Sequence, residues 1–228
     1  MKNPENFRPL ALAALEMIGS DRVIGLGSGR TAGAFTQALA EGVRGGMRVR
    51  GVATSKSTAA LAIQLGIPLV NLDEIEAIDV TVDGADEVDP ELNLIKGLGG
   101  ALVREKILAS ASRRLIIVVD SGKIVSALGE HGVLPLEVVP FGLAFARRRL
   151  SQLGYPPIPR RENGELFVTD NGNYILDCQV PVLQNPLETE QTLRAIPGVV
   201  GTGLFLGMAH TVLIQDGNEI RVRHRHGP

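Results

Sequence analysis

The sequence predicts an α/β protein, in which a Rossmann-like, mostly parallel open sheet carries a smaller α+β, ferredoxin-like second domain. The first 130 residues alternate strand and helix signals, which is typical of βαβ units with a parallel sheet. The stretch "RLIIVVD" (114–120) is uniformly apolar, as expected of a central strand covered on both faces. Near residue 131 the alternation of strand and helix signals ends, and strand signals interrupted by prolines follow.

Each element of the first domain has its own signal. The N-terminal residues 1–19 have the pattern of an amphipathic helix, and Ser57 or Ser55 is the expected cap of the helix at 55–66. Two more helices are expected at 30–42 and 99–112. Strands are expected at 22–27, 48–53, 67–72, 77–82 and 114–120.

The second domain is expected at 131–205, which leaves 1–130 and 206–228 for the Rossmann-like domain. Helices are predicted at 143–155 and 185–198, and a hairpin at 165–180 turns on "DNGN". A last hairpin around Asp216-Gly217 would return the chain to the first sheet.

Composition narrows the function classes. The net charge of −2 provides no field that would favour nucleic acid or a membrane, and no apolar run approaches the length of a membrane span. Cys178 is the only cysteine, which suits a reducing compartment, and it is expected to be a small buried residue. We therefore expect a cytoplasmic protein with no nucleic acid or membrane partner.

The first glycine loop, "GLGSGRTA" (25–32), follows a predicted strand and opens a helix. Backbone N–H groups at a helix N-terminus favour a phosphate or another anion. Gly27 to Ala32 also satisfies the dinucleotide fingerprint G-x-G-x-x-A. No carboxylate follows at the end of the second strand, where "VATSKST" stands, so an NADP enzyme is the form of that alternative that stays open.

The acidic stretch "VDGADEVDP" (82–90) raises the question of a metal. Its spacing does not fit a calcium loop, and no histidine stands near it, so we do not expect a metal there. Asp83 and Asp86 are expected at a strand end, where open α/β sheets bind ligands. Glu87 and Asp89 are expected to point to solvent.

A third cluster, "LIKGLGGALVREK" (94–106), supplies a lysine before a glycine loop and Glu105 on the helix that follows. A base, cations and strand-end carboxylates with no cofactor suit the abstraction of a proton next to a carbonyl.

These motifs, with others, follow one another along nearly the whole chain: "GLGSGRTA", "TSKST", "VDGADEVD", "KGLGGALVREK", "VVDSGK", "LPLEVVP", "VTDNGNYILD" and "IPGVVGTGLF". In this order and spacing the chain resembles type A ribose-5-phosphate isomerase. The resemblance implies metal-free interconversion of ribose 5-phosphate and ribulose 5-phosphate in the pentose phosphate pathway, by a homodimer or homotetramer.

The resemblance also implies roles for single residues. Glu105 would move the proton between C1 and C2, and Asp83 and Asp86 would handle the sugar hydroxyls and ring opening. Lys96 and Lys123 would place positive charge near substrate oxygens or phosphate. The remaining substrate-binding residues would be Ser28, Gly29, Arg30, Thr31, Gly84, Ala85, Gly97, Leu98 and Gly99.

The chain departs from the family pattern in its glycine loops. The first loop usually reads G-T-G-S-T, and here Ser28 and Arg30 replace the Thr and the Ser. The second usually reads K-G-G-G, and here Leu98 replaces the middle glycine, which would perturb affinity if that position needs a positive φ. Val103 stands where Thr is common. A non-catalytic sugar-phosphate-sensing domain stays open as a third class of function.

Overall fold

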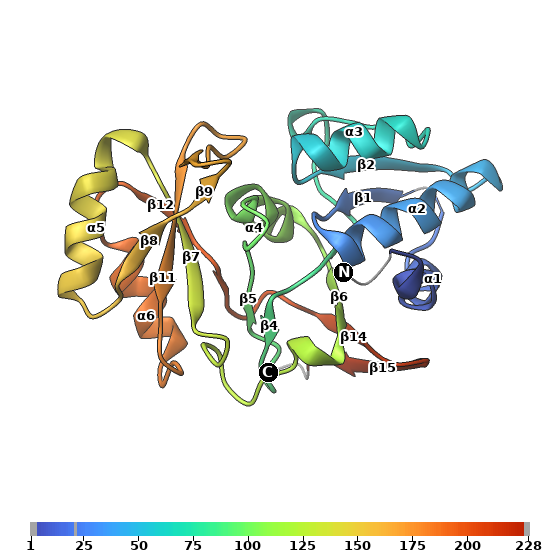
Figure 1. Cartoon of the computed structure of the whole chain (residues 1–228). Coiled ribbons are helices and arrows are strands. Elements are labelled where there is room, and N and C mark those ends of the chain that lie inside the picture. The colour runs from blue at the N-terminus through green and yellow to red at the C-terminus, as the bar shows by residue number, and fades with distance from the viewer. Residues whose placement is uncertain (1–3, 21, 226–228) are drawn as a thin grey trace. The chain divides into compact units, whose positions relative to one another are not determined.

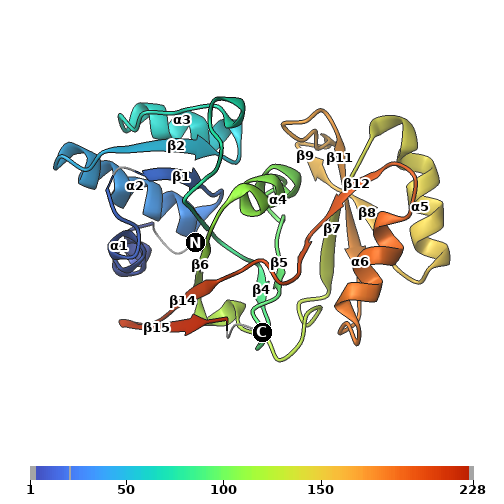
Figure 2. The ribbon, with the colours of Figure 1, turned by 180° about the vertical axis from the view of Figure 1, so that it is seen from behind.

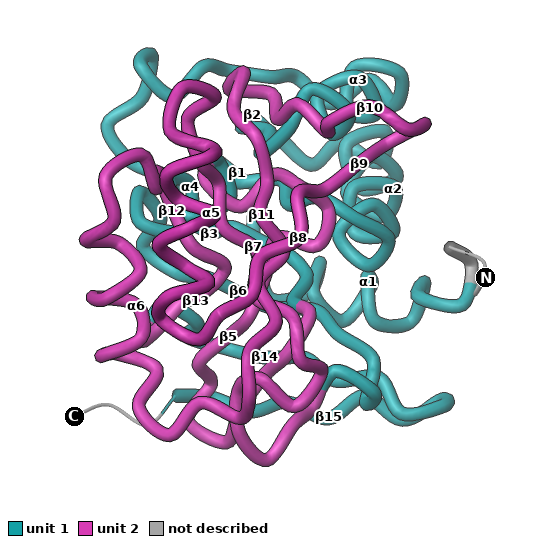
Figure 3. Tube along the Cα trace, turned by 60° about the vertical axis from the view of Figure 1, so that its left-hand side comes forward, with its two compact units in different colours: residues 1–85, 104–123, 208–228 teal, residues 86–103, 124–207 magenta. Residues whose placement is uncertain are grey.

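The computed structural model describes residues 4–20 and 22–225, which form two compact units (Figure 3). Unit 1 is residues 1–85, 104–123 and 208–228, and unit 2 is residues 86–103 and 124–207. The chain therefore passes between the units inside the acidic stretch and again just before Glu105. The predicted domain division, with its borders near 130 and 205, stays a prediction.

Unit 1 is built on a six-stranded sheet with the order β15-β14-β6-β3-β1-β2 (Figure 1). The pairs from β2 to β14 are parallel, and β15 is an antiparallel edge strand. This arrangement confirms the predicted α/β class. The strands are β1 (Arg22–Leu26), β2 (Val49–Ala53), β3 (Val80–Asp83), β6 (Leu115–Asp120), β14 (Thr211–Asp216) and β15 (Glu219–His224).

Helices cover both faces of this sheet because its strands alternate apolar side chains between two cores. On β1, Ile24 and Leu26 belong to the core that packs under α1 and α2, whereas Val23 belongs to a smaller core with Leu108 of α4. The helices and short 3-10 turns of the unit are η1 (Pro4–Phe7), α1 (Arg8–Glu16), α2 (Arg30–Arg44), α3 (Lys56–Gln64), η2 (Leu72–Glu74), α4 (Leu102–Ala111, of which residues 104–111 are in unit 1) and η3 (Ser121–Lys123).

Unit 2 contains an antiparallel four-stranded sheet in the order β12-β7-β11-β8. One face of the sheet carries an apolar core that includes Leu136 of β7 and the predicted buried residue Cys178 of β11. Burial, with the Asp177 charge as a smaller cause, raises the pKa of the Cys178 thiol to about 12. The strands and helices are β7 (Val133–Val138), η4 (Pro140–Gly142), α5 (Leu143–Gln152), β8 (Pro157–Pro159), β11 (Tyr174–Gln179), α6 (Pro186–Arg194) and β12 (Val199–Thr202).

Two smaller sheets complete unit 2. A three-stranded sheet has the order β13-β5-β4 and antiparallel pairs, and a two-stranded one joins β9 to β10. The strands are β4 (Glu87–Val88), β5 (Leu94–Ile95), β9 (Arg161–Glu162), β10 (Glu165–Leu166) and β13 (Leu204–Phe205).

Two predicted elements differ from the structure. The strand expected at 67–72 is reduced to an isolated bridge between Leu69 and Gly51, because Pro68 has no N–H to donate and Asn71 begins the turn η2 through a capping box with Glu74. The turn expected within 165–180 forms, since Thr169 N donates to Asn173 O at 2.8 Å, but a single bridge follows it. Strand β11 pairs with β7 and β8 instead.

The last predicted hairpin is confirmed. Strands β14 and β15 pair from Thr211 to Asp216, and β14 pairs in parallel with β6. The front and back views both show β14 and β15 side by side (Figures 1 and 2). In the part of the chain that the structure describes, the helices are too short or too polar to cross a membrane.

Candidate active site

The predicted loops of unit 1 meet at one edge of its sheet. The loops after β1, β2, β3 and β6 all leave the carboxyl ends of parallel strands, which lie at the same edge. Strand β1 lies between β2 and β3, so the connections diverge on either side of it. This is the topological switch point, where open α/β sheets bind their ligands.

Asp83 connects two of these loops. It is the last residue of β3 and buried, and its Oδ1 accepts hydrogen bonds from the backbone N–H groups of Ser28 at 3.1 Å and Gly84 at 2.8 Å. A Cβ atom at Gly27 would lie 2.2 Å from that same oxygen. Glycine at this position is therefore a condition for Asp83 to lie against the first loop.

The side chain of Ser28 turns toward the neighbouring loop after β2. Its hydroxyl lies 2.8 Å from Thr54 Oγ1, 2.9 Å from Ser55 Oγ and 3.2 Å from Thr58 Oγ1. Ser55 is the N-cap of α3 and accepts from Thr58 N at 3.0 Å, which decides the cap between the two predicted serines. The hydroxyls of "TSKST" thus hold the two loops together.

Gly29 is the N-cap of α2 and has a φ of 91°, a conformation that favours glycine. No side chain caps this 15-residue helix at Gly29, so the first backbone N–H groups, near Arg30 and Thr31, form a positive helix end. A Cβ atom at Gly84 would lie 2.9 Å from Thr31 Oγ1, which shows how closely the third loop approaches the first. Arg30 is exposed and Thr31 half-buried.

Two further predicted residues belong to unit 1. Glu105 lies in the first turn of α4 and is only 4% exposed. Lys123 ends the short turn η3 that follows β6 and is half-buried. A carboxylate and an ammonium group therefore stand on elements that flank this sheet.

In unit 2, Asp86 and Lys96 stand side by side. The pairing of Glu87 with Ile95 sets them opposite each other at the end of β4 and β5, and Asp86 N donates to Ile95 O at 2.8 Å. The Asp86 carboxylate accepts a hydrogen bond from the backbone N–H of Leu98 at 3.0 Å. Asp86 thus fixes the start of the second glycine loop.

Lys96 is buried, although lysine seldom is. Its Nζ lies 5.5 Å from the centroid of the Phe205 ring, within the range of a cation–π contact, and its backbone N donates to Gly203 O at 2.9 Å. The side chain and the main chain of Lys96 are both held by the segment around β13.

Glu87 and Asp89 are buried, so the prediction that they point to solvent is wrong. Glu87 is 1% exposed and accepts hydrogen bonds from the backbone N–H groups of Gly129 at 2.6 Å and His131 at 2.7 Å. Asp89 is 5% exposed and accepts from Asn93 N at 2.7 Å, and burial raises its pKa. The stretch forms a strand and a tight turn, and both carboxylates serve to anchor backbone.

Comparison with known proteins places these loops in a family. Residues 50–219 match the model of "Ribose 5-phosphate isomerase A (phosphoriboisomerase A)". The chain belongs to the ribose 5-phosphate isomerase A family. It is 50% identical to ribose-5-phosphate isomerase A of Gloeobacter violaceus over 93% of each chain, and 46% identical to that of Sphingopyxis alaskensis over 94% of each.

Solved structures of the family share the whole fold. A D-ribose-5-phosphate isomerase in complex with phospho-erythronic acid has a TM-score of 0.94 and 39% identity, over 99% of this chain and all of the other. The ribose 5-phosphate isomerase A of Methanocaldococcus jannaschii has a TM-score of 0.92 and 35% identity, over 98% and 100%. This membership makes the chain an isomerase and does not favour the NADP-dependent oxidoreductase or the sensing domain.

Leu98, which departs from the family pattern, does not have a positive φ angle and therefore does not strain the backbone of the loop. In the second loop the positive φ angles belong to Gly97 and Gly100, at 103° and 82°, while the non-glycine residues with positive φ in the described chain are Leu92 and Asn163. The Leu98 side chain is 47% exposed. The departure at this position therefore adds a side chain without straining the loop.

Sequence reasoning missed the residues that hold this loop from the sheet of unit 2. Arg160 donates to the carbonyl oxygens of Gly97 and Leu98 and also pairs with Asp177. Asp177 lay within the family motif "VTDNGNYILD", whereas Arg160 in "PRRE" carried no local signal.

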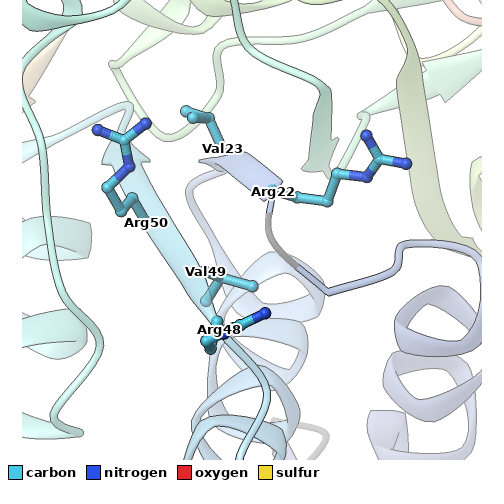
Figure 4. A pocket seen from close by; sticks show the side chains of 5 residues that line it. All are labelled: Arg22, Val23, Arg48, Val49 and Arg50. Atoms are coloured by element: carbon cyan, nitrogen blue, oxygen red, sulfur yellow. The ribbon is translucent and has the colours of Figure 1, made fainter.

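A pocket of about 310 Å³ lies at the opposite end of unit 1's sheet, at the start of β1 and β2. Its guanidinium groups, from Arg22, Arg48 and Arg50, point in different directions (Figure 4), so they do not converge on one anion. The pocket is therefore separate from the glycine loops described above.

Between residues 4 and 225, apart from residue 21, no three His, Cys, Asp or Glu side chains gather in a way that could hold a metal ion.

Proposed function

We propose that this chain interconverts ribose 5-phosphate and ribulose 5-phosphate through an ene-diolate, with Glu105 as the base that moves the proton between C1 and C2. Family membership carries the proposal. The burial of Glu105 supports its role, because a base shielded from water keeps the abstracted proton available for return.

Asp83, Asp86 and Lys96 would act on the sugar. Asp83 and Asp86 are three residues apart on the chain, so their Cα atoms lie within about 11 Å of each other. Backbone N–H groups orient each carboxylate, and in this orientation each would accept hydrogen bonds from sugar hydroxyls during binding and ring opening. The Lys96 ammonium would stabilise the negative charge that gathers on the ene-diolate oxygens.

The first loop would bind the phosphate. The N-terminal N–H groups of α2, near Ser28, Gly29, Arg30 and Thr31, suit an anion, and Lys123 at the same sheet edge would add charge. The exposed guanidinium of Arg30 would make a further contact. A solved relative is in complex with phospho-erythronic acid, a phosphate ester that carries a carboxylate, which supports a site for two negative groups.

The remaining loop residues would contact substrate mainly through their backbone. Gly84 and Ala85 follow Asp83, and Gly97, Leu98 and Gly99 follow Lys96, where small side chains or exposed backbone allow close approach. We propose no metal and no organic cofactor, and neither nucleic acid nor a membrane as a partner. The reaction belongs to the pentose phosphate pathway, and we propose that it takes place in the cytoplasm.

Glu105→Gln tests the base. The variant keeps the shape of the side chain but cannot accept the proton, so kcat for ribose 5-phosphate should fall by about 10² to 10⁴. The measurement is turnover to ribulose 5-phosphate in EDTA, together with NMR of deuterium exchange at C2 in D2O. Glu76→Gln, at an exposed carboxylate, is the matched control and should leave both unchanged. Full activity of folded Glu105→Gln would refute the assignment.

We also propose that the chain forms a homodimer or homotetramer. Phe141 is fully exposed and Phe145 is 46% exposed on the neighbouring helix of unit 2, so two aromatic side chains lie open to a second copy. Light scattering of purified protein should give a mass of two or four chains, and Phe141→Glu should lower it. A single-chain mass for the wild type would contradict the proposal.

A further inference from the structure

The second glycine loop, residues 97–100, lies against the face of the unit 2 sheet that is opposite its apolar core. On β11, Cys178 points into that core, so Asp177 projects from the other face. A Cβ atom at Gly100 would lie 2.5 Å from the Phe167 ring, and one at Gly201 would lie 2.9 Å from Val103. The loop therefore packs closely on this face.

Arg160 holds the loop at its carbonyl groups. Its Nη1 donates to Gly97 O at 3.2 Å and to Leu98 O at 2.9 Å. Because N–H and C=O point in opposite directions in a trans peptide, these two contacts also aim the N–H groups of Leu98 and Gly99 away from the sheet. The Leu98 N–H then reaches the Asp86 carboxylate at 3.0 Å.

The guanidinium of Arg160 is itself held in place. Nε donates to Asp177 Oδ2 at 2.9 Å, and Nη2 donates to Asp177 Oδ1, so the two groups meet fork to fork. The centroid of the Phe167 ring lies 5.9 Å from Arg160 Cζ. Only 14% of the Arg160 side chain and 24% of the Asp177 side chain are exposed. The planar guanidinium can donate through Nε and Nη2 to one carboxylate and through Nη1 to the loop carbonyls at the same time, whereas a lysine ammonium cannot form this arrangement.

We propose that Arg160 and Asp177 are a positioning pair, which sets the backbone of residues 97–99 for substrate without touching the substrate. The inference rests on the proposed role of this loop in sugar binding. When the pair is lost, the loop samples other conformations. The apparent affinity for substrate then falls in proportion to the fraction of molecules whose loop is still in the binding-competent conformation.

Arg160→Lys is the central test, because it keeps the charge and loses the fork. We expect KM for ribose 5-phosphate to rise about tenfold or more while kcat changes less than about threefold. Hydrogen–deuterium exchange of the peptide that covers 97–103 should become faster, with the unfolding midpoint close to that of the wild type. Arg161→Lys, at the exposed neighbour that donates to Gly164 O, is the matched control.

Asp177→Asn provides a second variant if Arg160→Lys does not fold. It should raise KM in the same direction, and the double variant should be no worse than the more affected single one, because Asp177 acts through Arg160. Wild-type KM and exchange in Arg160→Lys, or additive effects in the double variant, would overturn the proposal. An inactive wild-type chain would instead refute the isomerase function, and the exchange measurement would still decide whether Arg160 fixes the loop.

Discussion

Two glycine loops, residues 25–29 in unit 1 and residues 97–100 in unit 2, have similar sequences and are held by different contacts. In the first loop, glycine makes room for side chains of the neighbouring strand: Cβ atoms at Gly25 and Gly27 would lie 1.8 Å from Thr81 Oγ1 and 2.2 Å from Asp83 Oδ1. In the second loop, Gly97 and Gly100 are needed first for their positive φ angles.

The electrostatic supports also differ. The first loop is held by neutral hydroxyls and by one carboxylate that accepts from backbone N–H groups. The second is held between charged groups on two sides, Asp86 at an N–H and Arg160 at two carbonyls. We propose that the first loop binds the phosphate, which is the same in both sugars, and that the second loop binds the end of the sugar that changes.

The largest effect is expected at Gly27. Gly27→Ala would bring Cβ within 2.6 Å of the Asp83 backbone, which cannot move without separating β1 from β3. We expect the free energy of unfolding to fall by about 3 kcal/mol or more, measured by urea denaturation.

Gly99→Ala is the matched control in the second loop, because a Cβ there meets nothing within 4 Å and its φ is ordinary. Its stability should stay within about 0.5 kcal/mol of the wild type. Equal stability of the two variants would show that glycine at position 27 is not needed for the approach of Asp83.

A smaller effect is expected at Ser28. Ser28→Ala removes the hydroxyl that contacts Thr54, Ser55 and Thr58, and we expect a loss of about 1 to 2 kcal/mol in thermal or urea unfolding. Ser28→Thr keeps the hydroxyl and should retain most of this stability. If both variants lose the same amount, the hydroxyl cluster does not hold the first loop.

The sequence predicted the features that arise from local pattern. The alternation of strand and helix, the loops after β1 and β3 and the cap at Ser55 or Ser57 all follow from short-range rules, and the structure contains them. Short-range rules could not predict the two-residue strand β4, because its partner β5 and the N–H groups that bind Glu87 belong to other segments of the chain.

Arg160 shows the same limit at the second glycine loop. Its acceptors at Gly97 and Leu98 lie more than 60 residues earlier in the chain, so no spacing rule connects them. The residues of the second loop and Asp86, which holds one side of it, were predicted, whereas Arg160 on the other side could be identified only from the structure.

The smallest effect is expected at Leu98, where the second loop departs from the family pattern. Leu98→Gly increases the conformational entropy of the unfolded chain and should therefore lower the free energy of unfolding by about 0.4 to 1 kcal/mol. KM for ribose 5-phosphate should change less than about threefold, because Arg160 and Asp86 hold the loop through the Leu98 backbone and leave its side chain 47% exposed. Leu98→Ala, which removes the same bulk without the backbone freedom of glycine, is the control. A tenfold fall in KM for both variants would show instead that the leucine side chain obstructs the sugar. The affinity of the second loop for the sugar would then depend on the size of the side chain at position 98 rather than on the contacts that hold the loop backbone.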